Sequence, residues 1–235
     1  SQFAIRNSQF AIRNSQFAIR YLLERTTMGL RLLLVRHGET EWNAEGRYQG
    51  QTDVPLSEVG LRQAEAVAAR LAAEPLDAIY ASDLSRAAET GRAIARPHGL
   101  DVRLDPRWRE LSFGEWHGLT FAQMEAQAPE TVAWWNADRV HRAPPGGETM
   151  AELAARVQAA LDDIRRDHSD GTVLVAAHGG PIRVLLCLLL GKSPGDHWQF
   201  GMGNTSLTEV EFHRMGPVLR RLNDMQHLRV LRAED

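Results

Sequence analysis

The sequence is short of cysteine and of any excess charge. Its one thiol, Cys187, excludes an intrachain disulfide and a cysteine-rich metal site. Lysine and arginine together number 27 against 30 acidic residues, which gives a formal net charge of −3. This balance gives no reason to expect nucleic acid or an anionic membrane as a partner. An anionic ligand would therefore have to be held by local positive charge.

The sequence also lacks a segment suited to cross a membrane. The most apolar stretch, residues 172–191, carries His178, Pro181 and Arg183 near its middle. A spanning helix would bury this charge and break at the Gly-Gly-Pro step, whereas a buried strand followed by a buried helix explains the same residues. No basic start followed by a long apolar segment indicates a secretory signal. We therefore expect a cytoplasmic protein without a membrane partner.

The amino-terminal segment is repetitive. Residues 1–21 repeat the unit SQFAIRN, with Tyr21 as the single departure. A short tandem DNA repeat, TCGCAAT, translates into this same peptide. We hypothesise that the segment is translated simple-sequence DNA and that Met28 is the natural start, which mass spectrometry of the native amino terminus would test. Residues 1–27 are predicted to be a disordered extension, and residues 29–235 to form a single domain.

From residue 30 onward, short apolar runs alternate with segments of helical spacing. Strands are predicted at 30–35, 78–81, 102–104, 172–177, 206–212 and 218–223. Helices are predicted after Ser57, a suitable N-cap, after residues 82–83, from Glu148 onward and over 181–190. This alternation predicts an α/β three-layer sandwich, with a mostly parallel sheet and helices on both faces. Residues 106–147, rich in Trp, Pro and Gly, are predicted to form a small helical insertion over the strand ends.

Two of the predicted strands end in histidine followed by glycine. Arg36-His37-Gly38 follows the first strand, and His178-Gly179-Gly180 follows the strand at 172–177. The carboxyl ends of parallel strands meet at one edge of the sheet, where ligands bind. A guanidinium suits phosphate, a neutral imidazole can act as a nucleophile, and Gly38 would let a ligand approach the backbone. The two glycine amides after His178, at a helix start, can face an anion.

Two further residues are candidates for the same edge. Arg86 lies early in the helix that follows the strand at 78–81, although a solvated arginine is the alternative. Glu110 lies among aromatic residues, where partial burial would suit it to act as a general acid. Glu115 is its competitor for that role, and a surface position is the alternative for both carboxylates.

These residues carry a resemblance to a known family. Residues 34–43, Leu-Val-Arg-His-Gly-Glu-Thr-Glu-Trp-Asn, resemble the signature of the histidine phosphatase superfamily, which includes cofactor-dependent phosphoglycerate mutases. The similarity spans residues 30–228 and includes Arg86, Glu110 and His178 at plausible spacing.

The resemblance implies a role for each residue. By it, His37 accepts the phosphoryl group while its second ring nitrogen donates to a backbone carbonyl. Glu110 protonates the leaving oxygen and then helps water to attack phosphohistidine, while Arg36, Arg86 and His178 surround the phosphoryl oxygens. The phosphate-binding residues implied are Arg36, Gly38, Thr40, Asn43, Gln49, Gly50, Arg86, Gly179 and Gly180. The resemblance implies neither a metal nor another cofactor.

Within this family the residues favour a phosphatase. Phe121 stands where mutases of the family carry a lysine, and Trp134-Trp135-Asn136 stands in place of an arginine pair, with Arg139 and Arg142 as weak substitutes. Residues 110–118 resemble the phosphatase branch, notably α-ribazole and broad-specificity phosphatases. We predict a phosphoric monoester hydrolase. A cofactor-dependent phosphoglycerate mutase is the first alternative, and a catalytically silent phosphate-binding protein is the second.

The sequence leaves the substrate open beyond a small-molecule phosphomonoester. The aromatic side chains of the insertion either pack it or form an apolar wall beside the site: Trp108, Phe113, Trp116, Phe121, Trp134 and Trp135. The oligomeric state, a homodimer included, is left open as well.

Overall fold

One sheet forms the centre of the fold. The computed structural model describes residues 29–229 and 231, so the predicted extension, residues 1–27, lies outside the described residues. Six strands lie in the order β3-β2-β4-β1-β5-β6. They are β1 (Arg31–Arg36), β2 (Ala78–Ala81), β3 (Val102–Leu104), β4 (Thr172–Ala177), β5 (Leu207–His213) and β6 (Gly216–Asp224). β1 to β4 run parallel, and β5 is antiparallel to both of its neighbours. The prediction of a mostly parallel sheet is confirmed.

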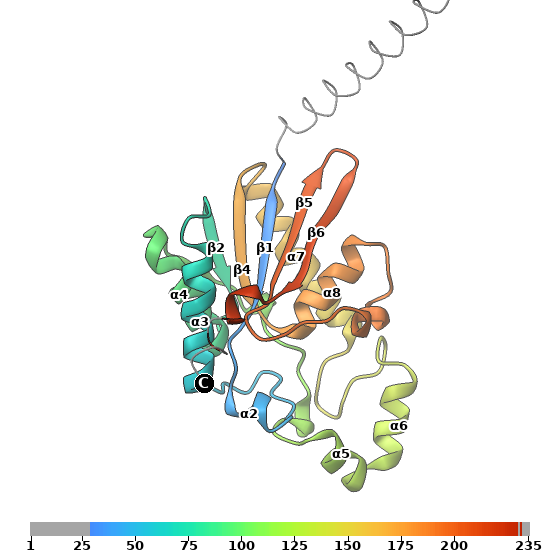
Figure 1. The fold of residues 1–235 in the computed structure, drawn as a ribbon. Helices are drawn as coiled ribbons and strands as arrows, with labels where there is room; N and C mark the ends of the chain where they lie inside the picture. Colours follow the sequence, from blue (N-terminus) through green and yellow to red (C-terminus); the bar gives the residue numbers. More distant parts are fainter. Residues whose placement is uncertain (1–28, 230, 232–235) are drawn as a thin grey trace, which may run out of the picture.

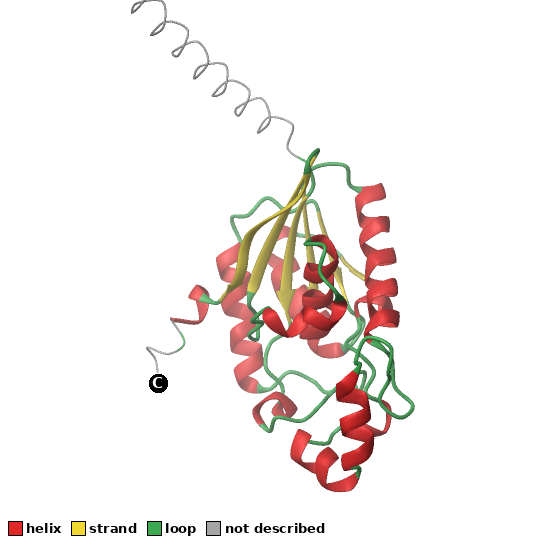
Figure 2. Cartoon of the chain, turned by 90° about the vertical axis from the view of Figure 1, so that its right-hand side faces the viewer, coloured by secondary structure: helices red, strands yellow, loops and turns green. Residues whose placement is uncertain are grey.

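Helices cover both faces of the sheet, as predicted (Figure 1, Figure 2). α3 (Glu58–Leu71) and α4 (Ser85–Ala95) cover one face and share a buried cluster with Leu33 of β1. α7 (Met150–Asp167) and α8 (Gly179–Leu189) cover the other and share a cluster with Leu32 and Leu34. Side chains alternate along a strand, so consecutive leucines of β1 serve opposite cores. This explains why the centre of the strand, Leu32 to Val35, is apolar at consecutive positions rather than at every second one.

Side-chain caps fix where the main helices begin. Ser57 caps α3 by accepting a hydrogen bond from the Gly60 amide, as the sequence predicts. Thr149 caps α7 in the same way, through the Glu152 amide. α8 begins at Gly179 rather than at the predicted Pro181, because His178 is its N-cap and the proline occupies its first turn. The bounds of β2, β3 and β4 are the predicted ones, and those of β1, β5 and β6 differ from the predicted ones by one or two residues.

The predicted insertion, residues 106–147, lies beyond the carboxyl ends of the parallel strands (Figure 1). It contains the 3-10 helices η2 (Pro106–Trp108) and η3 (Gly114–Trp116) and the helices α5 (Phe121–Gln127) and α6 (Pro129–Ala137). Trp116 and Trp135 are buried in a separate small core, with Phe113 and Phe121 packed against it. Trp134, by contrast, is 49% exposed. Packing of the insertion therefore accounts for most of its aromatic side chains.

The remaining elements are short. They are α2 (Glu41–Ala44), η1 (Arg96–His98), η4 (Pro194–Gln199) and η5 (Gln226–Arg229). Over the part of the chain that the structure describes, no helix has the length and apolar character needed to cross a membrane.

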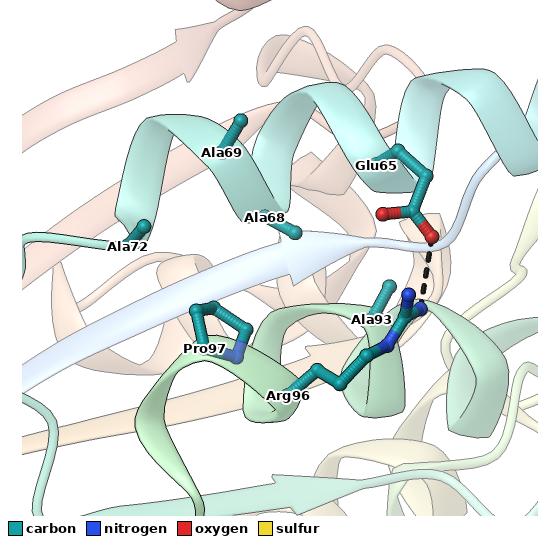
Figure 3. Close-up of a pocket in the computed structure, with 7 residues that line it drawn as sticks. All are labelled: Glu65, Ala68, Ala69, Ala72, Ala93, Arg96 and Pro97. Carbon is teal, nitrogen blue, oxygen red and sulfur yellow. Dashed lines mark hydrogen bonds and ion pairs between the residues drawn. The ribbon is translucent and has the colours of Figure 1, made fainter.

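A groove of about 400 Å³ lies between α3 and α4 (Figure 3). Alanines from both helices line it, and an ion pair of 2.9 Å between Glu65 and Arg96 crosses it. Arg96 follows Arg86 by roughly 15 Å along the axis of α4, at the usual rise per helical residue. The groove therefore lies away from the predicted site, and none of the predicted site residues lines it.

Candidate active site

The parallel pairing of β1 with β4 brings the two predicted histidines together. Arg36 is in register with Ala177, so His37 and His178 leave the sheet side by side. The His37 amide donates to the Ala177 carbonyl at 2.9 Å, and the two imidazole rings lie with centroids 5.0 Å apart. Both side chains are buried, with 3% of His37 and 0% of His178 exposed.

The surroundings of His37 keep its imidazole ring neutral and fix its tautomer. Its Nδ1 lies 2.6 Å from the Gly38 carbonyl oxygen, so Nδ1 carries the hydrogen and donates it. The lone pair is therefore on Nε2. Burial, and then the charges of Arg36 and Arg86, hold the pKa of His37 well below its ordinary value. The ring is consequently uncharged at neutral pH, which is the state that attack on phosphorus requires.

The half-buried Arg36 and the buried Arg86 adjoin His37, and backbone carbonyls hold their outer nitrogens. Arg36 Nη1 donates to the Met202 carbonyl at 2.6 Å. Arg86, fully buried, donates from Nη1 to the Thr52 carbonyl at 2.8 Å and from Nη2 to the Gly50 carbonyl at 2.7 Å. Burial lowers the pKa of Arg86 to about 10, which leaves it charged at neutral pH. Both Nε atoms are buried and have no hydrogen-bond partner among the described residues, so each has a donor to offer a ligand.

His178 adds a third unpartnered nitrogen. Its Nε2 lies 2.9 Å from the Ser82 hydroxyl, whereas its buried Nδ1 has no partner within the part of the chain that the structure describes. Burial, followed by the charge of Arg86, holds the pKa of His178 well below its ordinary value. When the Ser82 hydroxyl donates to Nε2, the neutral ring carries its hydrogen on Nδ1 and can donate it to an anion.

Glu110 is held by two main-chain amides. Its Oε1 accepts from the Leu111 amide at 2.8 Å, and its Oε2 accepts from the Gly180 amide at 3.1 Å. Arg36 and Glu110 lie close to the same backbone position, Gly179. A Cβ atom added there would be 3.8 Å from Arg36 Nε and 3.9 Å from Glu110 Oε2. The competing carboxylate, Glu115, is exposed on η3.

Two glycines differ from what the sequence suggests. The Gly180 amide, expected to face an anion, instead donates to Glu110, because the carboxylate lies over the start of α8. Gly38, expected to admit a ligand, donates its amide to Thr90 Oγ1 at 3.1 Å. A Cβ at this position would lie 2.5 Å from the Gly60 carbonyl oxygen. Gly38 is therefore required for close packing of the loop against α3.

The other predicted phosphate-binding residues lie on the loops after β1. Thr40 caps α2 and accepts from the Asn43 amide at 3.2 Å, while Asn43 Oδ1 accepts from the Thr40 amide at 3.1 Å. Gln49 is buried, and its Oε1 has no partner. Gly50 adopts a φ of 50°, and its carbonyl is the one that holds Arg86. These side chains and carbonyls thus shape the loop around the two arginines.

Comparison with known proteins agrees with this geometry. Residues 32–225 match the family described as the histidine phosphatase superfamily, branch 1. The chain belongs to the histidine phosphatase superfamily.

Relatives in this superfamily include named phosphatases. Phosphoserine phosphatase 1 of Hydrogenobacter thermophilus is 37% identical over 200 residues, which cover 85% of this chain and 94% of the relative. The structure of a mycobacterial glucosyl-3-phosphoglycerate phosphatase with VO3 aligns with a TM-score of 0.75 at 38% identity, covering 82% of this chain and 98% of the other. The structure of the α-ribazole phosphatase of Shigella flexneri aligns with a TM-score of 0.78 at 27% identity, covering 83% of this chain and 96% of the other. Other relatives are named phosphoglycerate mutases. The predicted family and the phosphoric monoester hydrolase class are confirmed.

Sequence reasoning missed several residues of this histidine phosphatase that contact the predicted site. Ser82 reaches His178 across 96 sequence positions. Asn204 Nδ2 donates to the His37 carbonyl at 3.2 Å, and the Thr205 amide donates to the same oxygen at 3.2 Å. Arg156 reaches the Glu110 carbonyl at 3.0 Å from α7. Ser82 and Asn204 lie close to the ends of strands, and this position is a weak indication in the sequence that they belong to the site. Arg156 occupies a polar position on an amphipathic helix, and this pattern gives no indication of a contact with the site.

Proposed function

We propose that this histidine phosphatase hydrolyses phosphomonoesters through a phosphohistidine formed on His37. The observation that supports this most directly is the set of three buried nitrogens without partners beside His37, namely Arg36 Nε, Arg86 Nε and His178 Nδ1. Leaving buried donors unpaired costs free energy, and the oxygens of a phosphoryl group would satisfy all three. The neutral Nε2 of His37 would then face the phosphorus atom.

In the first step, the lone pair of His37 Nε2 attacks phosphorus. The nitrogen–phosphorus bond forms as the bond from phosphorus to the ester oxygen breaks. Protonated Glu110 gives its proton to that oxygen, so the alcohol leaves uncharged and Glu110 becomes a carboxylate. The hydrogen bond from Nδ1 to Gly38 stabilises the positive charge that the ring gains.

In the second step, water attacks the phosphorus atom from the side that the alcohol has left. Glu110 takes a proton from the water, which returns the acid to its starting state. The nitrogen–phosphorus bond breaks, its electron pair returns to His37 Nε2, and phosphate is released. Arg36 and Arg86 supply the positive charge opposite the phosphoryl oxygens in both steps.

The insertion supports a phosphatase over a mutase. Phe121 packs against the core of the insertion, so this position offers no charge to a second phosphate. Arg139 and Arg142 stack over Trp135 and Trp134 with guanidinium-to-ring distances of 4.2 Å and 5.0 Å. A mutase must hold a bisphosphate and exclude water. The mutase alternative therefore predicts turnover of 3-phosphoglycerate that is stimulated by 2,3-bisphosphoglycerate, and the phosphatase predicts phosphate release instead.

Labelling tests the proposed function. Wild-type protein is incubated with a phosphomonoester labelled in its phosphoryl group and is run on an alkaline gel, because phosphohistidine is labile in acid. We expect label on the wild type and none on His37→Ala, together with phosphate release by the wild type only. Wild-type protein that takes up no label and releases no phosphate would leave the catalytically silent binding protein as the explanation.

A substrate panel would identify the ester. We propose phosphoserine, 3-phosphoglycerate and α-ribazole phosphate for the panel, because relatives are named for phosphoserine, for phosphoglycerates and for α-ribazole. Aryl phosphates complete the panel, because they test whether the aromatic side chains of the insertion favour apolar esters. The cytoplasmic location, a homodimer as the assembly and the absence of nucleic-acid and membrane partners stay predictions. Cell fractionation would test the location, and the mass of the protein in solution would test the homodimer. Binding assays with nucleic acid and with lipid vesicles would test the absence of these partners.

A further inference from the structure

Arg156 makes an unusually dense set of contacts behind the predicted acid. It lies on α7, its side chain is 18% exposed, and it forms an ion pair with Glu148 at 2.6 Å. Its Nη1 donates to the carbonyls of Arg107 and Arg109 at 2.7 Å and 2.6 Å. Its Nη2 donates to the Glu110 carbonyl at 3.0 Å. One guanidinium therefore binds three carbonyls of the segment that ends in Glu110.

Glu148 fixes the orientation of this guanidinium. Its two carboxylate oxygens accept from Arg156 Nε at 2.6 Å and from Nη2 at 2.8 Å, which is a bidentate pair. The Glu148 amide donates to the Ser112 carbonyl at 2.9 Å, and the Ser112 amide donates to Glu148 Oε2 at 3.3 Å. The pair thus joins the segment that carries Glu110 to the end of the insertion.

The main chain of Glu110 has few other supports. It lies in an irregular segment between η2 and η3, where no ladder of strand or helix hydrogen bonds holds it. Besides Arg156, only Gln51 Nε2, at 3.2 Å, reaches its carbonyl among the described residues. Its carboxylate, by contrast, accepts from the amides of Leu111 and Gly180. The position of the carboxyl group therefore depends on how firmly α7 holds the backbone behind it.

We propose that Arg156, oriented by Glu148, is a positioning residue that holds Glu110 where it can protonate the leaving oxygen. The inference rests on the proposed function. Arginine suits this role because its planar fork presents five donors in fixed directions, whereas the ammonium group of lysine is a compact point charge. A lysine at 156 would keep the charge but could not pair with the carboxylate and all three carbonyls at once.

The choice of substrate separates this role from a merely structural one. An alkyl phosphomonoester needs its leaving oxygen protonated, whereas p-nitrophenyl phosphate releases a stable anion and does not. Because kcat/KM reports the steps up to the first phosphoryl transfer, later hydrolysis does not obscure the difference. Arg156→Lys should lower kcat/KM for the alkyl ester by roughly 10- to 100-fold, the cost of a misplaced acid. For p-nitrophenyl phosphate it should change by less than about 3-fold.

Arg166→Lys is the matched control. Arg166 lies on the same helix, is 67% exposed and pairs only with surface carboxylates, so both substrates should be turned over at the wild-type rate. Glu148→Gln keeps the shape of the pair but removes its charge. Glu148→Gln should also lower kcat/KM for the alkyl ester but not for p-nitrophenyl phosphate. If thermal unfolding shows that Arg156→Lys does not fold, Glu148→Gln is the variant that tests the proposal.

The outcomes are distinguishable. An equal loss on both substrates, or no loss on either, in a folded Arg156→Lys or Glu148→Gln protein would overturn the positioning role while leaving the proposed function intact. Wild-type protein that turns over neither substrate would instead refute the proposed function itself.

Discussion

Gly180→Ala is expected to reduce turnover while leaving the fold stable, because of where the added methyl group would lie. A Cβ on Gly180 would be 2.0 Å from Glu110 Oε1 and 3.1 Å from its carboxyl carbon. The main chain of α8 is fixed by its hydrogen bonds, so the carboxylate is the group that must move. Its displacement would break the bond of 3.1 Å between the Gly180 amide and Oε2.

The magnitude follows from the geometry. Contacts of a Cβ below 3.0 Å are essentially never seen, so Oε1 must retreat from 2.0 Å by at least about 1 Å. A displacement of about 1 Å in a catalytic group costs about 100-fold in rate, which corresponds to roughly 2.7 kcal/mol of transition-state stabilisation. Alanine within a helix is favoured over glycine by roughly 0.5–1 kcal/mol, which offsets part of the lost hydrogen bond. The free energy of unfolding should therefore change by less than about 1 kcal/mol.

The assay pairs kcat/KM on an alkyl phosphomonoester with urea unfolding. Gly179→Ala is the comparison, since its methyl group would lie 3.8 Å from Arg36 Nε and 3.9 Å from Glu110 Oε2, both ordinary contact distances. It should cost less activity than Gly180→Ala. A Gly180→Ala protein with the kcat/KM of the wild type would refute the reasoning, because the carboxylate would then have moved without consequence.

Two further predictions concern histidines held by hydroxyl groups. Ser82→Ala removes the 2.9 Å contact that orients His178 and should lower kcat/KM roughly 10-fold; unchanged kcat/KM would contradict that role. Burial, then Arg70, lowers the pKa of His227 to about 4, against roughly 6.5 when unfolded. Between these values only the unfolded state binds the proton, so the free energy of unfolding falls as pH drops from about 6.5 to about 4, by at most roughly 3 kcal/mol for this buried side chain. Urea unfolding of His227→Gln should show a smaller loss, and an equal loss would contradict this.

The sheet and its helices could be predicted because their signals are local. The run from Leu32 to Val35 is apolar at every position, which is typical of a strand covered on both faces. Ser57, as N-cap, marks the start of α3 within one residue. The gathering of His37 and His178 follows from the topology, since parallel strands in register bring their carboxyl ends to one edge.

The contacts that place Glu110 could not be predicted in this way. Glu110 follows no periodic element, and one of the two amides that bind its carboxylate lies 70 positions away in Gly180. The guanidinium of Arg156, 46 positions away, binds its carbonyl. Such contacts depend on how loops pack after the sheet has formed. In the sequence, Gly38 and Gly180 could each serve either to admit a ligand or to let protein atoms pack closely. The structure shows close packing at both positions.

The arrangement of charge suits a phosphoryl group at this edge of the sheet. Arg86 is fully buried and Arg36 is half-buried, and burial holds the pKa of His37 and of His178 low enough for both rings to be neutral. A phosphomonoester dianion between the arginines would balance both of their charges. In the proposed reaction, Glu110 gives a proton to the leaving oxygen in the first step. Once that proton has left with the alcohol, the same carboxylate is ready to take a proton from water, so one side chain serves both steps without a second acid.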